Sequence, residues 1–155
     1  MVDLKEKNVK IILILFIFLL LDLLRPFGYF IHTEFLFLGI ILLSLNYPFL
    51  LSLVLSIIFG YLKDALSYGN IPLNLIEFSC IAIFIHYFLY RFNKKIIRLI
   101  VFFMAIIIHV FFNVITTREF NFIFSLWFFM HSVPMFLLIN YLSKKWVKTL
   151  SAEYI

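Results

Sequence analysis

The sequence predicts an all-α, polytopic integral membrane protein with about six transmembrane helices, short loops and both termini in the cytoplasm. The first observation is composition: 65% of the 155 residues are hydrophobic, 22 are Phe, and only 14% are charged. Soluble domains average about 45–50% apolar and about 25% charged residues, so a soluble core would not bury this much apolar surface. The second observation is that long apolar runs alternate with short basic clusters, which is typical of multi-pass membrane proteins. We therefore expect residues 1–155 to form a single membrane domain.

Six apolar runs mark the expected helices in chain order. They cover residues 9–24, 35–45, 49–62, 75–90, 96–115 and 122–142. The first run is followed by Arg25-Pro26, where proline ends a helix, and no small-x-small motif marks a signal-peptide cleavage site. The second run is short, and Asn46-Tyr47-Pro48 separates it from the third. This pair forms either two short spans or one re-entrant hairpin, and both options return the chain to the side that it left.

Basic residues indicate the orientation of the helices. With the N-terminus inside, ten Lys and Arg residues fall in inner segments, within residues 5–10, 91–98 and 144–148. The outer segments carry only Arg25, Lys63 and Arg118. Because Lys and Arg collect on the cytoplasmic side, six spans fit better than five, which would place one terminal basic cluster outside. Contact with lipid headgroups accounts for the net charge of +5, and the basic residues lack the interleaved aromatic residues of a nucleic-acid surface.

Polar residues within the apolar runs are candidates for chemistry, since such residues are costly in a membrane. A possible intramembrane polar cluster consists of Glu77, His86, His109, Asn113 and His131. Such a cluster would suit a proton or substrate site. The alternative, which we favour, is simple interhelical hydrogen bonding, worth ~0.6 kcal/mol per contact.

The sequence predicts no catalytic, cofactor-binding or metal site, and hence no enzyme. The four histidines lack a His-Glu-x-x-His pattern, and Cys80 is the one cysteine. No phosphate-binding glycine loop and no Gly-x-Ser-x-Gly elbow is found. Because the loops are also short, we expect the protein to act within or against the bilayer.

Residues 59–74, FGYLKDALSYGNIPLN, place a Lys-Asp pair, two glycines and a proline across the end of the third run and the segment that leads to the fourth. A polar turn between two membrane helices would account for them, with Gly60 permitting close helix approach. Asn74 and Glu77 lie three residues apart at the start of the fourth run. We therefore expect both side chains to face Asp64.

The same stretch resembles an element of the rod shape-determining protein MreD family, in which Gly, Asp, Ser and Gly follow one another in a similar pattern. The matching residues are Gly60, Asp64, Ser67 and Gly69. A length near 160, six hydrophobic segments and nearly absent loops also match, so the resemblance covers most of the chain. In three departures, Lys63 replaces an apolar residue, Tyr68 intervenes before Gly69, and Asn74 replaces a later glycine.

The resemblance implies a non-catalytic scaffold of the cell-elongation machinery for peptidoglycan synthesis, in the bacterial cytoplasmic (inner) membrane. Its implied partners are MreC-like and MreB-like proteins and a cell-wall polymerase and transpeptidase, with membrane lipid, no nucleic acid and no cofactor. The four matching residues would then shape a docking face. The alternative is the substrate-binding (S) component of an energy-coupling factor vitamin transporter. Its usual Ala-x-x-x-Ala pattern is absent from the first run, which disfavours it.

Overall fold

The computed structural model describes residues 2–24, 34–67, 72–91, 94–117 and 122–152, and every regular element in these ranges is a helix. The helices are α1 (Val2–Leu24), α2 (Phe35–Asn46), α3 (Phe49–Leu66), α4 (Leu73–Arg91), α5 (Lys94–Thr117) and α6 (Phe122–Ala152). The predicted all-α class is confirmed for this part of the chain. Each of the six apolar runs lies in a separate helix.

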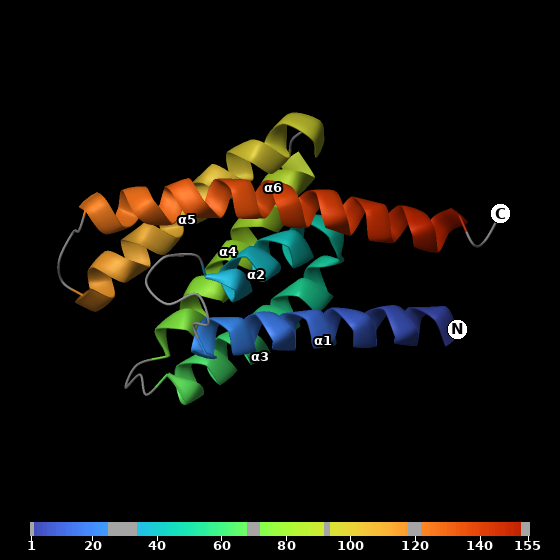
Figure 1. The fold of residues 1–155 in the computed structure, drawn as a ribbon, viewed down its shortest axis with the longest axis horizontal. Coiled ribbons are helices and arrows are strands. Elements are labelled where there is room, and N and C mark those ends of the chain that lie inside the picture. Colours follow the sequence, from blue (N-terminus) through green and yellow to red (C-terminus); the bar gives the residue numbers. More distant parts are fainter. Residues whose placement is uncertain (1, 25–33, 68–71, 92–93, 118–121, 153–155) are drawn as a thin grey trace.

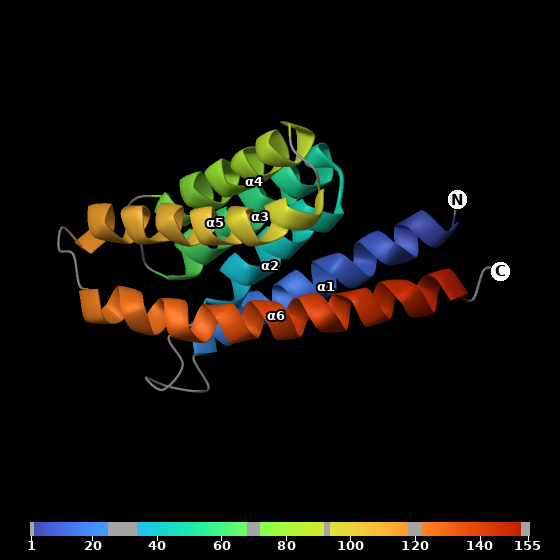
Figure 2. The same cartoon turned by 90° about the horizontal axis from the view of Figure 1, so that it is seen from above.

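Successive helices run in opposite directions, as Figure 1 shows. As a result α1, α3 and α5 end where α2, α4 and α6 begin, and the N- and C-termini lie at one end of the bundle (Figures 1 and 2). Within the first four helices, the backbone between α2 and α3 is a short connection at Tyr47-Pro48. The opposite end of the bundle therefore gathers the ends of α1 and α3 and the beginnings of α2 and α4.

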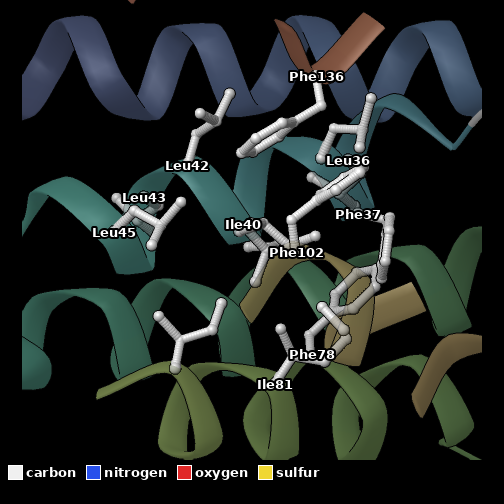
Figure 3. Packing of buried hydrophobic residues seen from close by; sticks show 14 of the residues in the cluster. Leu36, Phe37, Ile40, Leu42, Leu43, Leu45, Phe78, Ile81, Phe102 and Phe136 are labelled. Carbon is white, nitrogen blue, oxygen red and sulfur yellow. The ribbon is translucent and has the colours of Figure 1, made fainter. Parts of the chain in front are cut away.

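Helix α2 forms the centre of the bundle. Each of its residues from Phe35 to Leu45 is buried. Figure 3 shows side chains of α2 lying among Phe78 and Ile81 of α4, Phe102 of α5 and Phe136 of α6. With twelve residues, α2 is only about 18 Å long. A helix this short and this apolar is stable because other helices, rather than solvent, cover all its sides.

Aromatic rings connect α5 to α6. The rings of Phe102 and Phe136 stack with centroids 4.1 Å apart, and those of Phe103 and Phe129 stack at 5.6 Å. Such ring pairs contribute about 0.5–1.5 kcal/mol each beyond the area that they bury. The high Phe content of the chain is therefore used, in part, to join the last two helices.

The outer surface of the bundle is also apolar. Helices α1, α3, α4, α5 and α6 all expose large hydrophobic side chains, and Leu50, Ile107 and Trp127 are each more than half exposed. Among the described residues, α3 and α4 are the two helices with both the length and the apolar character to cross a membrane. Shorter apolar stretches are Phe35–Asn46, Ile100–Ile115 and Ser125–Leu138.

Candidate functional site

The side chain of Asp64, in the last turn of α3, caps the N-terminus of α4. Its Oδ1 atom accepts hydrogen bonds from the Asn74 backbone N–H at 3.0 Å and from the Asn74 side-chain amide at 2.6 Å. Its Oδ2 atom accepts from the Leu75 N–H at 2.9 Å. The first N–H groups of a helix have no partner within the helix, and a carboxylate there satisfies them and opposes the helix dipole. Asp64 therefore joins the two helices of the α3–α4 hairpin.

Gly60 lies one turn before Asp64, where α3 touches the backbone of α4. A Cβ atom at this position would lie 2.6 Å from the Leu75 Cα atom and 2.9 Å from the Asn74 carbonyl oxygen. Only glycine leaves room for so close an approach. Gly60 and Asp64 thus act on the same two residues of α4, one by contact and one by hydrogen bonding.

The other two residues of the motif have different positions. Ser67 ends α3: its N–H donates to the Lys63 carbonyl at 2.9 Å, and its hydroxyl donates to the Asp64 carbonyl at 3.4 Å. Gly69 lies outside the described residues. The motif residues Gly60, Asp64 and Ser67 therefore fix the end of α3 and its contact with α4.

The α1–α2 hairpin has a cap of the same kind. Asp22, near the end of α1, accepts hydrogen bonds from the N–H groups of Phe35 at 2.6 Å and Leu36 at 3.1 Å. In α2, Gly39 faces α1, where a Cβ atom would lie 2.7 Å from a ring carbon of Phe18. Each of the first two hairpins is therefore closed by an aspartate on its first helix and a glycine at its close approach. This recurrence is not apparent in the sequence, because the loops and the order of the residues differ.

Lys63 connects the two hairpins. It is buried at the end of α3, and its ammonium group pairs with the Glu34 carboxylate and lies 3.7 Å from Asp22 Oδ2. The same nitrogen lies 5.4 Å from the centre of the Phe78 ring, within cation–π range. Lys63 therefore bridges the end of α1, the start of α2 and α4. It is also the residue that replaces an apolar residue of the motif.

A second buried pair joins α4 to α5. His109 Nδ1 and Glu77 Oε1 are 2.6 Å apart, and both side chains are about 95% buried. His109 Nε2 points toward Glu34, with 4.0 Å between Nε2 and Oε1, and has no hydrogen-bond partner among the described residues. The pair thus adjoins the Lys63 ion pairs. We call these side chains the charge cluster: Asp22, Glu34, Lys63, Glu77 and His109.

The remaining polar candidates have partners elsewhere. His86 Nε2 lies 2.7 Å from the Ser52 hydroxyl, which joins α3 to α4 near the opposite end of the bundle. His131 Nδ1 bonds to the carbonyl oxygen of Trp127 at 2.9 Å, and the two rings stack within α6. Asn113 is partly buried on α5. Of the five residues in the polar set drawn from the sequence, the structure brings together Glu77 and His109.

Three members of the charge cluster are absent from that set. Asp22 and Lys63 stand at the edges of apolar runs, and Glu34 immediately precedes one. Charges at these edges in a charge-poor chain are the signal that would have found them. Within the described ranges, no group of three or more His, Cys, Asp or Glu residues is arranged to hold a metal ion. Comparison of the chain with protein-family models, with curated proteins and with solved structures finds no match.

Proposed function

We propose that the chain is a multi-pass membrane protein whose six helices lie in a bilayer, with both termini on the cytoplasmic side. Large apolar side chains are exposed on five helices, while the charge cluster is mostly buried among them. Soluble monomers rarely expose contiguous apolar patches beyond a few hundred Å². Lipid chains would cover this surface without the free-energy cost of exposing apolar side chains to water. The positive-inside pattern and the shared end of the two termini support the orientation (Figure 1).

The short central helix is compatible with this proposal. Irregular or short elements are tolerated at membrane depth where protein surrounds them, because their polar ends then find partners inside the protein. Helix α2 is surrounded, and Asp22 accepts from its first two N–H groups. It would be a short inner helix, about 18 Å long against roughly 30 Å of hydrocarbon.

Within this class, we propose a non-catalytic scaffold of the bacterial cell-elongation machinery, similar to MreD. The observation that carries the proposal is the contact of Gly60 and Asp64 with α4. This contact packs one face of α3, the helix that bears the motif, closely against α4. The opposite face of α3 is left exposed. It carries Leu50, Val54, Ile57, Ile58 and Tyr61, at the spacing of one helix face. A rigid apolar stripe of this kind suits docking of a partner's transmembrane helix.

The partner in this proposal is an MreC-like protein, with an MreB-like protein and a cell-wall polymerase and transpeptidase in the same assembly. The test is purification of tagged protein from its native cell in mild detergent, with identification of what co-purifies. MreC-like and wall-synthesis proteins would support the scaffold. Their absence from repeated preparations of folded protein would contradict it.

Substitutions in the same assay locate the docking face. Ile57→Trp adds bulk to the exposed stripe of α3, and we expect partner recovery to fall at least several-fold. Ile107→Trp, on the exposed face of α5, is the matched control and should leave recovery unchanged. Asp64→Ala should also lower recovery because it frees α4 from α3, whereas Asp64→Asn keeps one acceptor oxygen and should lose less. Equal recovery from Ile57→Trp and Ile107→Trp would refute a docking role for α3.

The second candidate is the substrate-binding component of an energy-coupling factor vitamin transporter. The observation in its favour is the charge cluster, because buried polar groups between helices at one end of a bundle suit solute binding. Under this proposal, a pair of ATPases and a coupling membrane subunit would co-purify in place of wall-synthesis proteins. The same purification therefore separates the two candidates.

A further inference from the structure

We propose that the charge cluster is a proton-binding site, and that His109 Nε2 is the atom that takes up the proton. The imidazole is about 95% buried, and its Nδ1 atom is bonded to Glu77. Its Nε2 atom has no hydrogen-bond partner among the described residues, yet it faces the Glu34 carboxylate at 4.0 Å. Buried polar atoms are nearly always hydrogen-bonded, so an unpartnered nitrogen directed at a carboxylate marks a candidate binding site.

A proton is the ligand that fits this geometry. If Nδ1 carries the hydrogen of the neutral ring, it donates to Glu77, and Nε2 is left with a lone pair directed at a carboxylate. Two acceptor atoms, His109 Nε2 and Glu34 Oε1, then face each other at 4.0 Å. A proton taken from solution and bound at Nε2 turns the ring into an imidazolium, which donates to Glu77 through Nδ1 and to Glu34 through Nε2. Glu34 is the most exposed member of the cluster, with one third of its side chain accessible, so it can move about 1 Å to complete this bond.

The charges around His109 support this assignment. Glu77 of α4 and Glu34 before α2 face the ring directly, and Asp22 of α1 adds a third carboxylate beyond Lys63. Lys63 of α3 is the positive group opposing them. With all three carboxylates ionised and His109 neutral, these five side chains would together carry two net negative charges. Placing like charges close together at a mostly buried site is costly, and a proton on His109 would reduce the net charge of the five to one.

The other two helices packed against His109 present apolar rings. Phe37 of α2 lies with its ring centre 4.8 Å from that of His109, and Phe128 of α6 stacks on it at 4.4 Å. These rings exclude water from the two faces of the imidazole. They also hold the imidazole ring on the line between the two glutamates. Proton binding would therefore connect α5 to both α4 and the start of α2, and proton loss would release the second connection. This inference is independent of whether the chain is a scaffold or a transporter component.

The experiment is a pH titration of the full-length protein in lipid nanodiscs, labelled with 15N-histidine and observed by NMR. Resonances of His109 are assigned by their loss in His109→Gln, and the other three histidines serve as internal references. Between pH 5 and 9 we expect Nε2 to convert from an unprotonated to a protonated nitrogen, while Nδ1 stays protonated. In Glu34→Gln the same conversion should need a lower pH, because an opposing charge has been removed.

Three results would overturn the proposal: a His109 that does not titrate in this range, one that carries its hydrogen on Nε2 throughout, or identical titrations in wild type and Glu34→Gln. A His109 resonance that shifts on addition of Na⁺ at constant pH would make a metal cation the ligand instead. Should Glu34→Gln fail to fold, Glu34→Asp keeps the charge but withdraws it from Nε2. The pH at which Nε2 becomes protonated should then fall by a smaller amount. An unchanged pH would refute the role of Glu34.

Discussion

The close contact at Gly60 predicts that one added methyl group separates α3 from α4. In Gly60→Ala the new Cβ atom would meet the Leu75 Cα atom at 2.6 Å, and an ordinary contact begins near 3.4 Å. The neighbouring atoms belong to the backbone of α4, so they cannot rotate away as a side chain can. The helices would have to move apart by about 0.8 Å at this point. A shift of that size would stretch the 2.9 Å bond from Leu75 to Asp64 beyond hydrogen-bonding distance.

Three contributions set the size of the effect. Overpacking a tight contact costs about 1–3 kcal/mol. Weakening the Asp64 cap costs about 0.5–2 kcal/mol more. Alanine recovers about 1 kcal/mol because it favours the helix over glycine. We expect Gly60→Ala to lower the free energy of unfolding by about 2 kcal/mol on balance.

Gly39→Ala is the matched control. Its Cβ atom would also be too close to neighbours, at 2.7 Å from Phe18 Cδ2 and 3.0 Å from Leu15 Cδ2, but these atoms belong to side chains, which can rotate, and not to backbone. Small side-chain shifts relieve the contact, and the gain in helix propensity of about 1 kcal/mol offsets their cost. Unfolding by SDS in mixed micelles, followed by tryptophan fluorescence, would compare both variants with wild type. Wild-type stability in Gly60→Ala, or an equal loss in both variants, would refute the reasoning.

Two further predictions concern the other polar contacts and use the same unfolding assay. Lys63→Met removes the positive charge that pairs with the buried Asp22 and the partly exposed Glu34 and should cost about 3–5 kcal/mol, while neutralising both carboxylates in the same variant should restore most of the loss. An equally unstable triple variant would show that packing, rather than charge, explains the effect. Ser52→Ala removes the hydrogen bond to His86 and should cost only ~0.6 kcal/mol, and a loss above about 2 kcal/mol would contradict a simple helix-bridging role.

The helices could be predicted from the sequence because their signals are local. Each apolar run is bounded by charged residues, neutral polar residues or proline, and Tyr47-Pro48 separates α2 from α3 where the sequence indicated. The contact between Asn74 and Asp64 was also predictable, because the two residues flank a short turn between adjacent helices. The enclosure of α2 was harder to foresee, since an apolar run of this length has the same composition whether lipid or protein covers it.

The partners of the buried charges could not be predicted, because they depend on how separate hairpins pack. Glu77 was expected to face Asp64 with Asn74, but it bonds to His109. Three residues of helix turn the side chain through about 300°, so Glu77 points about 60° away from Asn74 and toward α5. Lys63 meets Asp22 from another hairpin. No spacing along the chain predicts a contact of that kind.

The arrangement of charge explains how so apolar a chain specifies one fold. In the proposed membrane setting, apolar contacts between helices would be weakly selective, because lipid is as apolar as leucine. The caps by Asp22 and Asp64 fix which helices form hairpins, and Lys63 fixes how the two hairpins meet. The Glu77–His109 bond then sets the position of α5. These polar contacts are buried at one end of the bundle, and the outer faces of the helices are left apolar, as contact with lipid or with a partner helix under our proposal would require.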